Sequence, residues 1–169
     1  MLTTTICDEL RLATNFKSKV IGVAIKDRGS ILPAGHSANA AYWYDSKTGD
    51  FITSSYYMNQ LPAWVDQFNQ RKLVDSLYKL DWKAALTRET YLQYATDDVK
   101  DYESKPFGKE ATGFPYSLSA FAGKDYGKIA TTPYGNSWTA EMAKAAVLAE
   151  NLGKGGATDF LAGVFCSPA

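Results

Sequence analysis

The stretch Lys19-Val20-Ile21-Gly22-Val23-Ala24-Ile25 decides the fold class of this chain. It is rich in β-branched residues and apolar on both faces, which is typical of a strand buried between two layers, as in a parallel sheet. Residues 2–14, just before it, carry apolar side chains at helical spacing, with Thr3 or Thr4 as a cap. A helix that leads into a buried strand predicts an α/β fold.

A second strand of this kind is predicted near the other end, at Thr158-Asp159-Phe160-Leu161-Ala162-Gly163-Val164-Phe165. A helix precedes it, which Asn136 or Ser137 can cap and which Gly153 ends. The apolar face of that helix consists of Trp138, Met142, Ala145, Ala149 and Leu152. Helix and buried strand therefore occur in the same order at both ends of the chain.

Between these ends we expect a hairpin, a helix and an irregular segment. Residues 41–53 hold two aromatic or β-branched runs around a polar loop with glycine, which predicts a β-hairpin. A helix is expected to begin near Leu61, with Pro62 in its first turn, and its apolar pattern extends to Leu77. Residues 81–128 are rich in turn signals and charges, and we interpret them as an irregular insertion.

Length and charge limit the possible functions. The 169 residues suffice for a real core, and we treat residues 1–169 as a single domain. Eighteen basic residues balance 18 acidic ones, so no net charge attracts the chain to nucleic acid or to a membrane. No apolar run approaches the roughly 20 residues that span a bilayer, and no basic region followed by an apolar stretch opens the chain. We therefore expect a soluble product without an export signal of its own.

Histidine and cysteine are too scarce for a self-contained metal site. His36 is the single histidine, and zinc sites usually combine several His or Cys ligands, so no metal ligand is predicted. His36 also has no Asp or nucleophile partner that the sequence identifies, which favours a structural or exposed histidine over a general base. Cys7 and Cys166 are expected to be reduced and structural, and a disulfide between them is the alternative.

Two cationic residues directly follow the first predicted strand. Lys26 and Arg28 flank Asp27, and ligands of open α/β sheets bind beyond the carboxyl ends of the strands. Arginine can hold a phosphoryl group through two parallel hydrogen bonds, and lysine acts as a point charge. The alternative is a turn whose charges contact only water, and the spacing alone favours it because the motif is short. Residues 29–37 are expected to form a glycine-bearing loop beside these charges.

Two further polar segments have both a functional and a structural interpretation. Residues 131–137 can form an anion-binding loop at a helix N-terminus, although a simple capped turn is commoner. Asp97, Asp98 and Asp101 can bind a metal, although a solvated surface is expected in such a polar stretch. No Gly-x-Ser-x-Gly motif and no second histidine complete a triad, so no catalytic residue is assigned.

The segment 18–35, SKVIGVAIKDRGSILPAG, closely resembles a segment of the type I phosphodiesterase/nucleotide pyrophosphatase group in the alkaline phosphatase superfamily. More narrowly, it is similar to bacterial alkaline phosphatases of the PafA type, and residues 41–45, 61–65 and 135–162 follow in the order of that family. The resemblance implies an α/β/α sandwich that hydrolyses phosphate esters with two zinc ions and a Thr or Ser nucleophile. It also implies that Lys26 and Arg28 contact the non-bridging oxygens of the phosphoryl group and stabilise its charge.

The chain also departs from the pattern of that family. The nucleophile and the first metal carboxylate correspond to positions before Met1, and residues 163–169 drift away from the Asp-rich, His-containing segment that ligates zinc. The resemblance therefore implies an internal fragment that is inactive alone and holds no cofactor itself, although the full-length family uses zinc. Two alternatives stay open: a module that binds phosphorylated ligands, and a structural module that self-associates through exposed sheet edges. The family is exported, and the compartment of this chain is not assigned.

Overall fold

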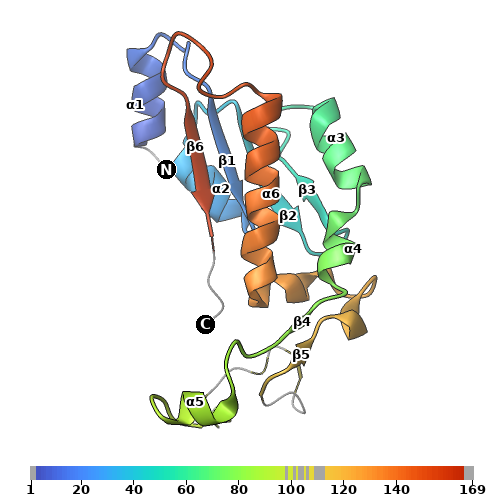
Figure 1. Cartoon of the computed structure of the whole chain (residues 1–169). Helices are drawn as coiled ribbons and strands as arrows, with labels where there is room; N and C mark the ends of the chain where they lie inside the picture. Colours follow the sequence, from blue (N-terminus) through green and yellow to red (C-terminus); the bar gives the residue numbers. More distant parts are fainter. Residues whose placement is uncertain are drawn as a thin grey trace.

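A four-stranded sheet forms the centre of the structure (Figure 1). In this computed structural model residues 3–165 are described, apart from residues 98, 101, 103, 104, 106 and 109–112. The strands lie in the order β3-β2-β1-β6, where β1 is Val20–Ala24, β2 is Ala40–Asp45, β3 is Asp50–Ile52 and β6 is Phe160–Val164. β1 pairs in parallel with β2 and β6, whereas β2 and β3 are antiparallel. The predicted strands and the predicted hairpin are confirmed.

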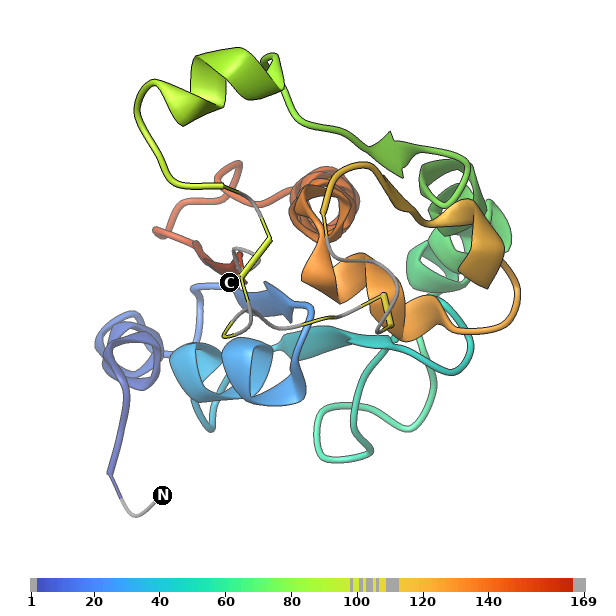
Figure 2. The same cartoon turned by 90° about the horizontal axis from the view of Figure 1, so that it is seen from below.

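Helices cover both faces of this sheet (Figure 2). α2 (Asp27–Ala34) packs on one face, against β1, β2 and β6, and α1 (Ile6–Ala13) lies against α2. α6 (Pro133–Ala149) packs on the other face together with α3 (Ala63–Gln70) and α4 (Leu73–Leu77). All five residues of β1 are buried between these layers. The arrangement confirms the predicted α/β class.

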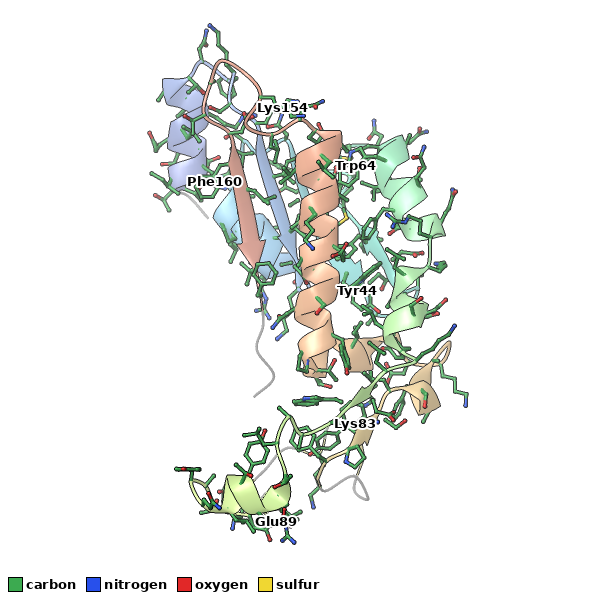
Figure 3. All side chains as sticks on the ribbon, in the orientation of Figure 1. Tyr44, Trp64, Lys83, Glu89, Lys154 and Phe160 are labelled. Carbon is green, nitrogen blue, oxygen red and sulfur yellow. The ribbon has the colours of Figure 1, made fainter. Side chains whose placement is uncertain are left out.

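Aromatic rings fill the core between the sheet and α6. Trp138 of α6 stacks on Phe68 of α3 with ring centroids 5.0 Å apart, and its ring lies 5.5 Å from that of Phe51 in β3. All three side chains are buried. Tyr44 of β2 and Trp64 of α3, which Figure 3 labels, belong to the same core: the ring centroid of Tyr44 lies 6.1 Å from that of Phe51, and Trp64 packs against the buried cluster. This aromatic packing joins the hairpin to the helices on that face.

The first helix is shorter than predicted because its cap lies further along the chain. Neither Thr3 nor Thr4 caps it; instead Thr5 accepts a hydrogen bond from the N–H of Asp8, and the Asp8 carboxylate accepts one from the N–H of Thr5. This reciprocal capping box fixes the start of α1 at Ile6.

Two later helix boundaries also differ from the prediction. α6 begins at Pro133 with Thr132 as its N-cap, so Asn136 and Ser137 lie inside the helix and do not cap it. Proline suits the first helical position because its missing N–H would have no partner there. The helix expected from residue 61 to 77 is interrupted at Lys72, whose φ of 46° separates α3 from α4.

The glycine-bearing loop predicted for residues 29–37 is wrong, because residues 29–34 belong to α2. Gly22 of β1 explains how this helix packs: a Cβ at Gly22 would lie 2.2 Å from the carbonyl oxygen of Ser30. Only glycine lets the α2 backbone approach the strand so closely. The helix ends at Gly35, whose φ of 84° favours glycine.

β6 departs from the prediction in burial and not in position. Its residues form the expected strand, but Phe160 is 38% exposed and Gly163 is also exposed. β6 lies at the end of the strand order, and β1 is its only partner among the described residues. An apolar sequence predicts helices on both faces of a strand and says little about how many strands lie beside it.

The described residues of the segment 81–128 extend beyond the end of the main sheet toward which β6 points (Figure 1). Their described part forms only short elements: β4 (Asp81–Trp82), α5 (Arg88–Leu92), β5 (Tyr116–Ser117) and the 3-10 helices η1 (Ser119–Phe121) and η2 (Tyr126–Thr131). β4 and β5 pair antiparallel, and the rings of Trp82 and Tyr116 lie 5.4 Å apart. Throughout the described ranges, no helix has the length and apolarity needed to cross a membrane.

Candidate functional site

Lys26 and Arg28 lie at the edge of the sheet where the parallel strands end. Lys26 follows β1 and is the N-cap of α2, and Arg28 is in the first turn of that helix. Gly29 lets this turn approach the sheet, because a Cβ at Gly29 would lie 3.1 Å from the Cβ of Ala24 and 3.5 Å from that of Val164. Both cations therefore stand beside the carboxyl ends of two neighbouring strands, β1 and β6.

The charges of Lys26 and Arg28 are available to a ligand. Both residues are exposed, and neither forms an ion pair with any residue that the structure describes. Asp27 lies between them, and its Oδ1 accepts the N–H of Arg28 at 2.7 Å. The positive end of α2 adds to the field of the two cations, while Asp27 weakens it. An oxyanion can be held here by the Arg28 fork and by Lys26 as a point charge.

The segment 131–137 forms the end of η2 and the first turns of α6. Thr132 is buried, and its hydroxyl donates a hydrogen bond to the carbonyl of Ile129 at 2.9 Å. This hydroxyl therefore serves the local turn. The N-terminus of α6 points toward the same end of the sheet as that of α2 (Figure 1), but the two helices lie on opposite faces (Figure 2).

The described residues contain no group of three or more His, Cys, Asp or Glu side chains that could hold a metal ion. Asp97 forms an ion pair with Arg88 at 2.9 Å, while Asp98 and Asp101 lie outside the described residues. Cys7 is buried and free, and Cys166 also lies outside the described residues. The residues that the structure places therefore do not fit a zinc centre by themselves.

His36 has an acidic partner that the sequence did not reveal. The Nδ1 atom of His36 lies 3.5 Å from Oδ2 of Asp8, and the imidazole is half exposed while the carboxylate is buried. Asp8 also accepts hydrogen bonds from the N–H and the hydroxyl of Ser37, at 2.7 and 2.8 Å. Since Ser37 donates to Asp8 and not to His36, the three side chains do not form a nucleophile–base pair. The only sequence signal for Asp8 was its capping-box spacing from Thr5.

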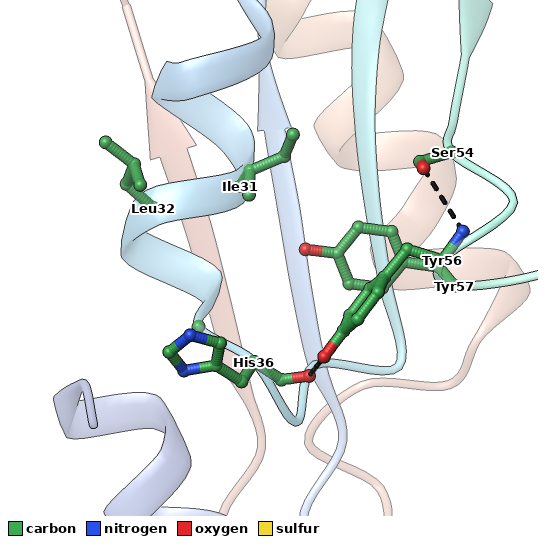
Figure 4. Close-up of a pocket in the computed structure, with 7 residues that line it drawn as sticks. Ile31, Leu32, His36, Ser54, Tyr56 and Tyr57 are labelled. Carbon is green, nitrogen blue, oxygen red and sulfur yellow. Dashed lines mark hydrogen bonds between the residues drawn. The ribbon is translucent and has the colours of Figure 1, made fainter. Parts of the chain in front are cut away.

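A pocket of about 230 Å³ lies next to His36, at the end of α2 away from the two cations (Figure 4). The hydroxyl of Tyr56 donates a hydrogen bond to the carbonyl of His36 at 2.9 Å. The pocket is lined by Ile31, Leu32, Gly35, His36, Ser54, Tyr56 and Tyr57. Lys26 and Arg28 are not among the lining residues, so the pocket and the pair of cations are separate sites.

Asp8→Asn is expected to destabilise the chain at neutral pH. Burial opposes ionisation of Asp8, but hydrogen bonds from Ser37 and Thr5 outweigh it and lower the pKa of this carboxyl group well below its ordinary value. Losing these charged hydrogen bonds should reduce the free energy of unfolding by about 2–3 kcal/mol. Because the folded-state pKa is lowered, the stabilisation is complete above the unfolded value of about 4 and declines as the pH falls below it.

Urea unfolding of the wild type and of Asp8→Asn between pH 7 and pH 3 measures this effect. The difference between the two proteins should be largest at neutral pH and should shrink as the pH falls below about 4. A difference that stays constant over the whole range would contradict the role assigned to the carboxylate.

Known proteins resemble the chain over almost its whole length, although no family model matches it. The alkaline phosphatase PhoV of Synechococcus elongatus is 52% identical over 162 residues, which are 96% of this chain and 29% of PhoV. A Myroides odoratus protein named calcium-transporting ATPase is 52% identical over 165 residues, 96% of this chain and 30% of that protein. The alkaline phosphatase PafA of Elizabethkingia meningoseptica is 45% identical over 162 residues, 94% of this chain and 29% of PafA.

Solved structures of PafA have the same fold. The wild-type crystal structure matches with a TM-score of 0.87 and 42% identity, over 94% of this chain and 31% of the PafA chain. A PafA variant with four substitutions matches with a TM-score of 0.86 and 41% identity, over the same shares of the two chains. The chain therefore spans about 30% of the length of the relatives that it matches.

Proposed function

This chain belongs to the family of the alkaline phosphatases PhoV and PafA, and from that premise we propose that it supplies the phosphoryl-binding part of a zinc-dependent phosphate-ester hydrolase. The observation that carries the proposal is the position of Lys26 and Arg28. Both are exposed cations without an ion-pair partner among the described residues, and they stand where parallel strands end. Ligands of open α/β sheets bind at that edge.

The PafA variant supports the assignment of Lys26 and Arg28. In that protein a lysine and an arginine two positions apart are each replaced by alanine, together with a threonine-to-serine and an asparagine-to-alanine change. Lys26 and Arg28 have the same residue types and the same spacing. We infer that they correspond to this pair.

In the proposed reaction the two side chains act on the phosphoryl group and not on a proton. Arg28 would hold two non-bridging oxygens through its fork, and Lys26 would add a positive charge beside them. Charge on these oxygens would be stabilised by the pair as the ester bond breaks. Zinc, when bound in the complete hydrolase, would activate the nucleophile and polarise the phosphoryl group. The described residues contain no group of three or more potential zinc ligands, and this supports our proposal that the chain is inactive by itself.

A second candidate function is a module that binds phosphorylated ligands without cleaving them, and the same two cations favour it. The name of the Myroides relative refers to ATP, which is a phosphorylated ligand of the class that such a module would bind. The names of PhoV and PafA and the match to the PafA structure favour an ester as the substrate.

Activity of the chain alone and inside a complete relative tests the proposed function. The 169 residues are assayed with added zinc and 4-nitrophenyl phosphate, and then as a chimera in which they replace the matched 29% of PhoV. We expect no turnover by the chain alone and turnover by the chimera. Zinc-dependent turnover by the chain alone would overturn the proposal that the chain is inactive by itself. A folded but inactive chimera would count against the proposal that the chain is part of a phosphate-ester hydrolase.

Inorganic phosphate should bind weakly to the chain alone at Lys26 and Arg28. Two exposed cations without a metal support a dissociation constant of about a millimolar. In an NMR titration the amide signals of residues 26–30 should move with phosphate, and Lys26→Ala/Arg28→Ala should abolish the movement. The matched control is Arg71→Ala/Lys79→Ala, which removes the same charge from exposed positions just after α3 and α4. If both double variants lose the movement of these amide signals equally, phosphate responds to net charge and not to a site at Lys26 and Arg28.

A further inference from the structure

The pocket next to His36, which we name the His36 pocket, lies between the end of α2 and the turn at residues 55–57 (Figure 4). Its volume of about 230 Å³ is below the roughly 300–1,000 Å³ that is typical of sites for drug-sized ligands. Gly35 of this pocket follows Lys26 by nine positions, which is about 13 Å along a helix. A ligand small enough for the pocket therefore does not also contact Lys26 and Arg28.

Two aromatic rings form one wall of the His36 pocket. The ring centroids of Tyr56 and Tyr57 lie 5.1 Å apart, and the ring planes meet at 85°. The Tyr56 ring is held in place because its hydroxyl donates to the carbonyl of His36 (Figure 4). The faces of aromatic rings are negative and attract a cation that lies within about 6 Å of the centroid. No lysine or arginine lines this pocket in the described structure, so the two rings have no cation there.

A buried carboxylate lies directly behind the pocket. Oδ2 of Asp8 is 3.5 Å from Nδ1 of His36, and a Cβ at Gly35 would lie 2.6 Å from the same oxygen. Asp8 forms no ion pair with a lysine or arginine among the described residues. Burial raises the pKa of the Tyr57 hydroxyl, and interactions with Tyr56 and Asp8 raise it further. The field of Asp8 therefore reaches a residue that lines the pocket.

The end of α2 adds negative charge of its own. The helix ends at Ala34 with Gly35 as its C-cap, and the carbonyl end of a helix carries a partial negative charge. Helix end, carboxylate and aromatic faces thus have the same sign. They favour a cationic ligand in the His36 pocket and oppose an anionic one.

The walls also indicate which kind of cation fits. Besides the two tyrosines, the lining includes the aliphatic side chains of Ile31 and Leu32, and the hydroxyl oxygen of Ser54 already accepts the N–H of Tyr56 at 3.1 Å. A primary ammonium group brings three N–H donors, and each one that is buried without a partner opposes binding. A quaternary ammonium ion has no N–H donor and presents apolar alkyl groups on all sides. The lining therefore favours the quaternary ion.

We propose that the His36 pocket is a binding site for a small quaternary ammonium ion. The positive charge lies against the rings of Tyr56 and Tyr57, in front of the Asp8 carboxylate, and the alkyl groups contact Ile31 and Leu32. This site lies at the opposite end of α2 from the candidate phosphoryl site and shares no residue with it. The proposal is therefore independent of the proposed hydrolase.

An NMR titration of the 169-residue chain with tetramethylammonium chloride tests this proposal. We expect a dissociation constant of about 1–10 mM, with movement of the amide signals of residues 35–36 and 54–57. The matched neutral probe is tert-butanol, which has a similar shape, and acetate is the anionic probe. Both should bind at least about 10-fold more weakly. Equal affinity for tert-butanol would overturn the role of charge, and with it the proposal.

Substitutions of Tyr57 separate the ring from its hydroxyl. Tyr57→Leu removes the ring and should weaken tetramethylammonium binding about 5-fold or more, whereas Tyr57→Phe keeps the ring and should stay within about 2-fold of the parent. Tyr94→Leu, at a residue that is 88% exposed and outside the pocket, is the matched control and should bind as the parent does. Unchanged affinity in a folded Tyr57→Leu variant would contradict the proposed contact.

The PhoV chimera shows whether the site exists in a complete hydrolase. Saturation-transfer NMR on the methyl protons of tetramethylammonium should give a signal with the chimera, and Tyr57→Leu in the chimera should reduce it. A folded chimera without this signal would overturn the site. A signal from a chimera that lacks activity would uphold the His36 pocket and count only against the proposed hydrolase.

Discussion

Lys26→Ala/Arg28→Ala in the PhoV chimera should lower kcat/KM for 4-nitrophenyl phosphate about 10³-fold or more. Removal of a single donor that stabilises developing oxyanion charge typically costs about 10²–10³ in rate, and this variant removes two. Both side chains are exposed and without ion-pair partners among the described residues. Their truncation should therefore leave the stability of the chimera within about 0.5 kcal/mol of the parent. A steady-state assay combined with thermal unfolding measures both quantities.

Arg28→Lys separates the charge of the arginine from its geometry. Lysine keeps the positive charge but cannot make two parallel hydrogen bonds to one phosphoryl group, so we expect a loss of about 10-fold or more in kcat/KM. Arg71→Ala/Lys79→Ala serves again as the matched control and should keep the parent rate. If the double variant of Lys26 and Arg28 behaves like this control, the two residues do not contact the phosphoryl group.

Gly22→Ala should be the most damaging conservative substitution in the sheet, with a loss of about 3 kcal/mol or more in the free energy of unfolding. A Cβ at Gly22 would lie 2.2 Å from the Ser30 carbonyl oxygen and 3.0 Å from the Cβ of Ala34. The first of these contacts is with the backbone of α2, so no side-chain rotation can relieve it. The whole helix must move away from β1, or the strand must bend.

Gly156→Ala is the matched control for Gly22→Ala, because a Cβ at Gly156 meets nothing within 4 Å and its backbone does not require glycine. It should change the free energy of unfolding by less than about 0.5 kcal/mol in the same urea titration. Gly22→Ala should also weaken phosphate binding, since α2 carries Arg28 in its first turn. A loss of less than about 1 kcal/mol for Gly22→Ala would show that α2 is not held as tightly as the structure indicates.

Much of the fold was predictable from local patterns. The continuous apolar run of β1 and the hairpin of β2 and β3 depend on residues close together in the chain, and both are confirmed. The position of Lys26 and Arg28 beyond a strand end followed from β1 alone. The extent of α2 did not, because Gly29 and Pro33 are read as loop residues, while the helix is held by its fit onto Gly22.

The contact between His36 and Asp8, away from the pair of cations, is one that no local pattern could predict. His36 and Asp8 are 28 positions apart, and they meet because α1 packs against α2 and Gly35 turns the chain at the end of α2. The cap was predicted at Thr3 or Thr4, so the capping box of Thr5 and Asp8 was missed, as was the second use of the carboxylate at Ser37. Side-chain pairs of this kind depend on how helices dock, and docking is decided by the whole core.

By itself the sequence determined the α/β class, the order of the strands along the chain and the cationic pair after β1, because hydrophobic periodicity and strand ends are properties of neighbouring residues. Only the tertiary structure decided that Asn69 hydrogen-bonds the backbone of Phe51 in β3, and that β6 has no second partner strand among the described residues. Both are strands with apolar residues, and which edge has a partner depends on the residues that the fold brings beside it.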